Sequence, residues 1–588
     1  MDSRFLHLLE SNIAPTPLEV VTIQAEVERL TSKTDPTQHD PELEATLERY
    51  RGILSPIRQI PSEIWGEIFY FATPVVVSEW YKDRLVRLCC VCSTWYEAAL
   101  LAHGLWANIH LAPLPEGKRY IYDNLVSWLA RSGELKKGLE YRSNVWEDYD
   151  PEDEDDEPTE EGFCPCHSRG SCMWMEDPVI SRLMAEGPLL LHRVSFQNMY
   201  PRCIRNAMRS FQVAKSGSTS TRSWNQIQEL DLRMATACYQ GWWDERSDSF
   251  ELPFRLIPPS VTSLVICLPL QRYVFDTQVE CDRAEIDIKP SIIERLTSLV
   301  LTSDWGHLHI VTILQHCSNL ETLHLRFRGL QNFIDQPLDE FDDSDPIIHR
   351  LQVEGGIHLP KVHSLRLYDG CESPILFLQW IKTPELRSLD LETGEFTPIH
   401  LNWTDTLDDF VARSGCARGI QVLRLAIQPH TYPYKLDPAR LFSERIGAFL
   451  SSLTSLTHLT FAELPIMPVL RIGSQNVDSS LQGPSNHDWL PQLQSLQLLH
   501  CWDGRYRYNG DIDFNKWLTF FRVNFGGRQS PCWISIELSL SREDSKLRRH
   551  IRKASALLRA ELGISFKLSL SFKRKLVEEQ TFKNLSNF

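Results

Sequence analysis

Four side chains of types that bind zinc lie close together in this chain: Cys164, Cys166, His167 and Cys172, within the stretch CPCHSRGSC. Closed tetrahedral zinc sites usually combine one closely spaced ligand pair with a second, distant pair. Here every candidate ligand falls within one short stretch, and the Cys-Pro-Cys loop is too tight for two ligands of one ion. We therefore expect a loop with incidental cysteines and no bound metal, with zinc binding as the alternative.

No other stretch carries the spacing of a catalytic or cofactor-binding motif. The sequence lacks the glycine-rich phosphate and dinucleotide loops, the H-E-x-x-H metal motif and the G-x-S-x-G nucleophile turn. Carboxylate pairs such as Asp342-Asp343 and Asp408-Asp409 lie in polar segments, which indicates solvated surface. The basic stretch from Lys546 to Lys553 predicts a solvated helix face rather than a membrane or nucleic-acid patch. The residues thus predict neither an enzyme nor a cofactor.

The bulk composition indicates a folded chain that does not bind nucleic acid. Of 588 residues, 42% are hydrophobic and 23% are charged, which is typical of a globular protein. The formal net charge of −16 argues against nonspecific nucleic-acid binding, because such binding requires clustered Lys and Arg. Part of this charge lies in Glu147–Glu161, which contains no basic residue. Such a run repels itself and buries nothing, so we expect a disordered insertion over residues 144–175.

Neither a secretion signal nor a membrane span is expected. The N-terminal residues lack a basic segment followed by a long apolar one. No apolar run approaches the roughly 20 residues that cross a bilayer. Many of the 15 cysteines lie within hydrophobic patterns, which is typical of unpaired thiols in a reducing compartment. These features predict a soluble protein inside the cell, in the cytoplasm, the nucleus or both.

The first predicted region, residues 1–55, is a pair of amphipathic helices. Apolar residues recur at helical spacing in two stretches, at Val20, Ile23, Val27 and Leu30 and again at Leu43, Leu47, Tyr50 and Leu54. Asp40, directly ahead of Pro41, predicts the N-cap of the second helix. The pair is expected to form a short antiparallel hairpin or a dimerising coil.

The second predicted region, residues 56–111, is a small domain of short helices. Its first helix is expected to start after Pro61 and to carry an apolar stripe of Ile60, Ile64, Ile68 and Phe69. Two further helices are expected over the block LVRLCCVCSTWYEAALLAHGLW. Periodicity alone predicts a helical domain with some exposed apolar surface.

The residues of this region resemble the F-box family. The matching anchors occur in the order and at the spacing of the family: Ile60, Pro61, Glu63, Ile64, Ile68 and Phe69, then Val91, Cys92 and Trp95, then Leu105 and Trp106. The chain departs from the family pattern at Ile60 and Trp65, which replace the usual leucines, and at Ser93-Thr94, which lack the customary basic residue. The helical pair upstream looks like that of fungal F-box proteins.

The resemblance implies that this region binds a Skp-type adaptor and, through it, a cullin and a RING subunit. Such docking places apolar side chains in a hydrophobic cleft of the partner. The positions carried over from the family as adaptor-facing or supporting are Ile60, Pro61, Ile64, Ile68, Leu88, Val91, Cys92 and Trp95. Any one of them could instead fill the core of the domain, as we expect of Trp95 and Phe69.

The third predicted region, residues 189–575, repeats a short phrase of the form Leu-x-x-Leu-x-Leu. Ten such phrases align on their fourth residue, at Val194, Leu230, Leu264, Leu299, Leu323, Leu365, Leu389, Leu423, Leu459 and Leu496. Two of the steps between them are 24 residues and the others are 34 to 42. Only the shorter steps match a standard leucine-rich repeat. Apolar segments that are expected to be helical lie between the phrases.

These repeats predict an α/β fold in which strand–helix units stack into an irregular, leucine-rich-repeat-like, right-handed solenoid. In such a stack, alternate leucines of each strand point inward and the helices cover the leucine face of the strands. We expect the strands to form a parallel sheet on the concave side of a curved solenoid. Residues Trp533–Phe572 are expected to close the stack as strand, helix and strand. An ordinary α/β sheet with leucine-rich strands is the alternative. Residues 112–188 are a connecting region, and 576–588 form a tail.

A helical F-box followed by irregular repeats is a common layout in the family. It implies the substrate-receptor subunit of an SCF-type (Skp adaptor, cullin, F-box) ubiquitin ligase, whose repeats bind a protein substrate that the sequence does not identify. The alternative is a non-ligase interaction scaffold that uses the same regions. Neither hypothesis requires nucleic acid, a membrane or a cofactor.

Overall fold

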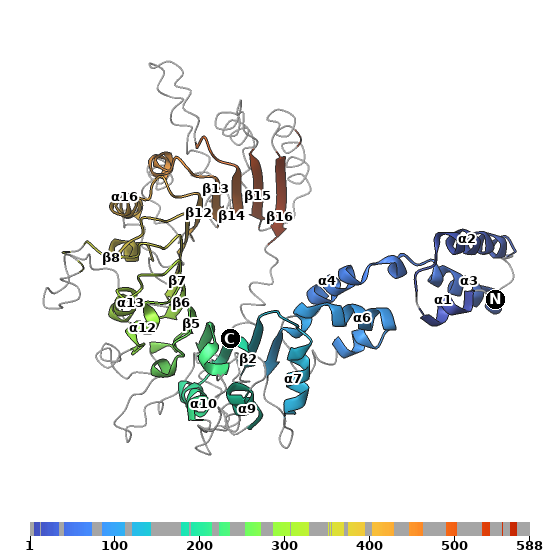
Figure 1. Cartoon of the computed structure of the whole chain (residues 1–588). Coiled ribbons are helices and arrows are strands. Elements are labelled where there is room, and N and C mark those ends of the chain that lie inside the picture. Colours follow the sequence, from blue (N-terminus) through green and yellow to red (C-terminus); the bar gives the residue numbers. More distant parts are fainter. Residues whose placement is uncertain are drawn as a thin grey trace, which may run out of the picture. The chain divides into compact units, whose positions relative to one another are not determined.

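The computed structural model of the chain is shown in Figure 1. The residues that it describes are 5–11, 13–33, 40–72, 85–111, 120–142, 178–186, 190–213, 223–235, 253–271, 286–305, 307–327, 351, 353, 355–369, 374–393, 403–427, 446–462, 490–501, 532–540, 556 and 565–572. The chain divides into two compact units. The first holds Met1–Asn144, Pro165–Gln197 and Arg209–Gln228, and the second holds Val145–Cys164, Asn198–Met208 and Glu229–Phe588.

The first unit opens with three helices around a small apolar core: α1 (Leu6–Ser11), α2 (Pro17–Thr31) and α3 (Pro41–Ile53). The core consists of Phe5, Leu8, Ile23, Leu30, Leu47, Tyr50 and Ile53. As predicted, Asp40 caps α3 by accepting hydrogen bonds from the backbone N–H groups of Glu42 (3.1 Å) and Leu43 (3.2 Å). The two predicted helices are therefore present, and α1 is an additional element.

Short helices and a first strand follow: η2 (Pro56–Gln59), α4 (Ser62–Ala72), the helical residues 85–89, α6 (Ser93–Leu101), η3 (His103–Trp106) and β1 (Asn108–Leu111). The carbonyl of Pro61 accepts the first hydrogen bond of α4, from the N–H of Trp65 at 3.1 Å. This helix therefore begins directly after Pro61, which confirms the sequence prediction for its start.

The chain then runs through α7 (Tyr122–Ala130), β2 (Lys137–Arg142), α9 (Pro178–Glu186), β3 (Leu191–Met199), α10 (Pro201–Val213) and η5 (Ser223–Gln226). Strands β1, β2 and β3 are parallel, and their register places Ile109 beside Leu139 and Leu139 beside Val194. All three of these side chains are buried. Strands β1 and β2 lie ahead of the first phrase that the sequence analysis recognised, so the parallel strands begin earlier than predicted.

The second unit is built on a large parallel sheet. Its strands are β4 (Glu229–Met234), β5 (Ser263–Cys267), β6 (Ser298–Ser303), β7 (Thr322–Phe327), β9 (Ser364–Asp369), β11 (Ser388–Thr393), β12 (Val422–Ile427), β13 (His458–Ala462), β14 (Ser495–Cys501), β15 (Trp533–Leu540) and β16 (Ser565–Phe572). They lie side by side in chain order, and every described pair is parallel. The predicted parallel pairing of the leucine phrases is confirmed within this sheet.

The register of the sheet follows the phrases residue by residue. The aligned positions from Leu230 to Leu496 are direct partners along the sheet, and the series continues to Ile534 and Phe566. The aligned residues from Leu230 to Ile534 are at most 1% exposed. Because side chains alternate along a strand, burying this row on one face leaves the intervening residues on the opposite face.

Helical segments cover the leucine face of this sheet. They include η6 (Pro253–Leu256), α12 (Pro290–Ile293), α13 (His307–Leu314), α15 (Pro374–Phe377), η9 (Leu378–Trp380), α16 (Trp403–Ser414) and the helical residues 446–452. Figure 1 shows α12, α13 and α16 on the same side of the strands. Their apolar residues, such as Val311, Leu407 and Phe449, are buried.

The connection between β9 and β11 differs from the single helix that is expected between two leucine phrases. The segment PILFLQWIKTPEL forms only one turn in α15 and one in η9 before β10 (Ile381–Lys382), which pairs in parallel with β8 (Ile357–His358). Gly356 makes this approach possible: its φ is +109°, and a Cβ at this position would lie 2.9 Å from the carbonyl oxygen of Trp380. The mixed helix–strand fold is thus less regular in its connections than in its strands.

Candidate functional site

Helix α4 carries apolar side chains on two different faces. Trp65 and Phe69, one turn apart, are buried. Ile64 is 51% exposed, Ile68 is 39% exposed and Phe71 is 81% exposed. These three residues and Pro61 are spaced by three or four positions, so they share one face of the helix. We refer to Pro61, Ile64, Ile68 and Phe71 as the α4 stripe.

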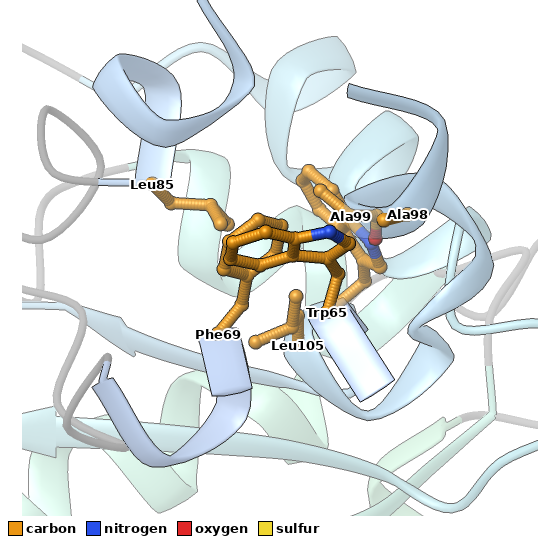
Figure 2. Packing of buried hydrophobic residues seen from close by; sticks show 7 residues of the cluster. Trp65, Phe69, Leu85, Ala98, Ala99 and Leu105 are labelled. Atoms are coloured by element: carbon orange, nitrogen blue, oxygen red, sulfur yellow. The ribbon is translucent and has the colours of Figure 1, made fainter. Parts of the chain in front are cut away.

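The buried face of α4 closes an aromatic core with α6. The ring of Trp65 lies 5.6 Å from that of Phe69 and 4.5 Å from that of Trp95, between centroids. Phe69 also meets Trp95 edge-on, at 5.2 Å. Figure 2 shows Trp65 and Phe69 converging with Leu85, Ala98, Ala99 and Leu105. The core is therefore filled by the buried face of α4. The side chains of the α4 stripe are not part of it and stay accessible.

Small residues allow α4 and α6 to approach closely. Gly66 faces α6, where a Cβ would lie 2.9 Å from the Cβ of Ala102. The indole Nε1 of Trp106 donates a 2.7 Å hydrogen bond to the carbonyl of Ala99, so this buried polar group is satisfied. The guanidinium of Arg131 lies over the ring of Trp106, at 4.7 Å from its centroid. The Gly66 contact places α4, the helix that carries the α4 stripe, directly against the end of α6, and the other two contacts hold Trp106 in the same core.

The residues predicted to face or support an adaptor fall into two groups. Pro61, Ile64, Ile68 and Val91 are exposed, and Val91, in the turn before α6, is 57% exposed. Ile60, Leu88 and Trp95 are partly buried against the core, and Cys92 is partly buried at the N-cap of α6. Phe71 was not predicted, although its position three residues after Ile68 is a signal that could have identified it.

Burial disfavours the reactive thiolate form at three cysteines of the described residues. Burial raises the pKa of Cys317 to about 12 and that of Cys416 to about 11. Burial also raises the pKa of Cys89, in the segment before α6. A thiol with a raised pKa stays protonated at neutral pH and is a poor nucleophile. Among the residues that the structure describes, no group of three or more His, Cys, Asp and Glu side chains could hold a metal ion.

A second candidate site lies on the face of the second unit that the leucines leave free. Arg366 of β9, Asp390 of β11 and Arg424 of β12 are direct neighbours across three strands. Arg366 Nε lies 2.9 Å from Asp390 Oδ2, and Arg424 Nη1 lies 2.8 Å from Asp390 Oδ1. Arg424 Nη1 also lies 3.0 Å from Glu392 Oε2. The leucine phrases do not predict this network, because it is formed by the residues between the leucines.

Several candidates of the sequence analysis lie outside the described residues: the cluster Cys164, Cys166, His167 and Cys172, the acidic run Glu147–Glu161, Asp342-Asp343 and the basic stretch Lys546–Lys553. Asp408 and Asp409 are described and are exposed on α16, as expected. Partial burial and the neighbouring Asp405 and Asp409 raise the pKa of Asp408. Within the described parts of the chain, no helix is long and apolar enough to cross a membrane.

The comparisons with known proteins add no family to these observations. No protein-family model matches the chain, and no curated protein matches it.

Proposed function

We propose that this chain is the substrate-receptor subunit of an SCF-type ubiquitin ligase. The observation that carries this proposal is the α4 stripe: Ile64, Ile68 and Phe71 are exposed on one face of a helix whose other face is fully packed. Such a helix fits the helix-in-groove mode of binding, in which an apolar cleft covers exposed side chains. The groove belongs, in this proposal, to a Skp-type adaptor that brings the cullin and the RING subunit.

The burial of each residue supports a division of roles within this interface. Pro61, Ile64, Ile68 and Val91 contact the adaptor directly, since their side chains are accessible. Ile60, Leu88, Cys92 and Trp95 are partly buried and support the F-box from inside. Phe71 extends the contact at the far end of α4.

The second unit is, in this proposal, an irregular leucine-rich-repeat-like, right-handed solenoid that binds a protein substrate. The parallel strands and the buried row of aligned leucines support this interpretation, because stacked units share one continuous core. The face opposite the leucines then offers side chains to a partner. Ubiquitin transfer is carried out by the other subunits, and the chain itself contributes binding only, inside the cell.

The test is co-purification of the full chain with recombinant adaptor, cullin and RING subunits. We expect one complex that contains all four proteins. Capture of the adaptor without the cullin would favour the non-ligase scaffold, since the adaptor would then be held outside a ligase. Failure to capture the adaptor at all would contradict both functions.

A further inference from the structure

The sheet face opposite the leucines concentrates charge over β7, β9, β11 and β12. Two rows of direct neighbours cross these strands: His324, Arg366, Asp390 and Arg424 in one row, and Arg326, Tyr368 and Glu392 in the next. We refer to Arg326, Arg366 and Arg424, with Asp390 and Glu392 between them, as the arginine patch. The patch holds three guanidinium groups and two carboxylates, a local excess of positive charge on a chain of formal net charge −16.

The arginines of this patch keep N–H donors that no residue described by the structure uses. Arg424 contacts both carboxylates through Nη1 alone. The Nε of Arg366 forms an ion pair with Asp390 at 2.9 Å, but the geometry of this contact is not that of a hydrogen bond. Arg326 is exposed and forms no ion pair with any residue that the structure describes. A guanidinium carries a fork of N–H groups, so each of these side chains can still bind an incoming oxyanion.

Two of the three guanidinium groups, those of Arg366 and Arg424, are also held in place before any partner arrives. Arg366 stacks on the ring of Tyr368, at 4.2 Å from its centroid, and Arg424 is bound to Asp390 and Glu392. A side chain that is already ordered loses less conformational entropy when it binds. The side chain of Arg366 is nevertheless 41% exposed, so it remains accessible from solvent.

The chemistry of the patch favours carboxylates as its ligands. Its arginines already bind carboxylates of the protein itself, at distances of 2.8 to 3.0 Å. The net negative charge of the chain repels any polyanion at long range, and the repulsion grows with the number of charges, so a short acidic segment that needs only local complementarity is favoured over nucleic acid. We propose that the arginine patch binds a carboxylate-rich segment of the substrate protein, an inference that rests on the proposed substrate-receptor function.

The probe is a fluorescent octaglutamate peptide, with octaglutamine and an oligouridylate as comparisons, and binding to the full chain is measured by fluorescence anisotropy. The octaglutamate should bind, more weakly as salt is added, and octaglutamine should not. Equal binding of the oligouridylate and the octaglutamate, or no binding of the octaglutamate, would overturn the proposal.

Two sets of variants locate the site. Arg326→Ala with Arg366→Ala should weaken octaglutamate binding by about tenfold or more, and Asp390 keeps Arg424 as its partner in this variant. The matched control is Arg255→Ala with Arg295→Ala. Like the test variant, it removes one arginine that forms an ion pair, Arg255 with Asp287, and one exposed arginine, Arg295. Equal losses in both double variants would refute the assignment to the patch.

A gain of binding gives a result that misfolding cannot imitate. Asp390→Asn removes the carboxylate that competes for Arg366 and Arg424, so octaglutamate should bind more tightly than to the unchanged chain. Unchanged or weaker binding would contradict the proposal. These measurements do not involve the adaptor, so a chain that captures the adaptor but fails to bind octaglutamate would refute this inference alone.

Discussion

The indole ring of Trp95 lies against that of Trp65, with centroids 4.5 Å apart and ring planes inclined by 47°. This contact joins α6 to α4, because Trp65 lies on the buried face of α4. A residue that the F-box resemblance associates with the adaptor surface therefore also holds the helix that carries the α4 stripe. Its role in the fold can be tested without any partner.

Replacement of Trp95 should destabilise the helical domain without a partner present. Trp95→Ala removes contacts with Trp65 and Phe69, and loss of a large aromatic side chain from a core costs about 3 kcal/mol. Hydrogen exchange should become faster in residues 62–72 and 93–101. The control is Tyr96→Ala, since the neighbouring Tyr96 is 48% exposed. Equal exchange rates in the two variants would show that Trp95 is not a core residue.

The close approach of α4 and α6 at Gly66 makes a second prediction. A Cβ there would lie 2.9 Å from the Cβ of Ala102, so Gly66→Leu should force the helices apart at a cost of about 2 kcal/mol or more. Gly52→Leu is the control, because nothing lies within 4 Å of a Cβ at Gly52. Thermal unfolding should show a lower melting temperature for the Gly66 variant only. An unchanged or higher melting temperature for the Gly66 variant would contradict the close contact between the two helices.

In the parallel sheet, the aligned leucines should be far more sensitive than their neighbours on the other face. Leu389 is fully buried, so Leu389→Ala should destabilise the second unit by about 2–5 kcal/mol through the cavity that it leaves. Val422 on the adjacent strand is 39% exposed, so Val422→Ala should have little effect. Hydrogen exchange over β9, β11 and β12 distinguishes the two. Similar exchange in both variants would mean that the leucine face is not the core.

His324 predicts a pH dependence of stability. Burial and the nearby positive charge of Arg366 lower its pKa, while Asp390 acts in the opposite direction. The unfolded chain, with an ordinary histidine pKa of about 6.5, therefore binds the proton first as the pH falls. Stability should be lost from about pH 7 down to the lowered pKa, and His324→Gln should reduce this loss. Melting temperatures that fall in parallel for both proteins over this range would contradict the prediction.

The strands were the most predictable part of the fold. The phrase around Leu389 repeats often enough that its alignment predicted the actual register, in which Leu389 lies between Leu365 and Leu423. Strands β1 and β2 were missed because NIHL follows a helical pattern and KGLEYR lacks the full phrase. The connections were harder to predict, since a segment such as 374–386 begins with a nearly continuous apolar run, PILFLQWI, whose periodicity does not distinguish one long helix from two short turns.

The candidate sites were predictable only in part, because sequence spacing does not measure exposure. Ile64 and Trp95 both match the resemblance, yet Ile64 is half-exposed and Trp95 is partly buried between two rings of α4. The arginine patch depends on which residues of distant strands become neighbours. Arg366 and Arg424 are brought to either side of Asp390 only by the register of the sheet.

The most direct test of the proposed function is the affinity of the full chain for the Skp-type adaptor, measured by titration calorimetry. The test variant combines Ile64→Glu, Ile68→Glu and Val91→Glu, which are exposed positions and spare the partly buried Ile60. The control combines Ile13→Glu, Leu18→Glu and Val21→Glu, exposed apolar positions at the start of the chain. Since central apolar anchors contribute about 2 kcal/mol or more each, the test variant should form no measurable complex while the control binds like the unchanged chain. Undiminished adaptor binding by the test variant would contradict the proposed interface and the ligase function with it.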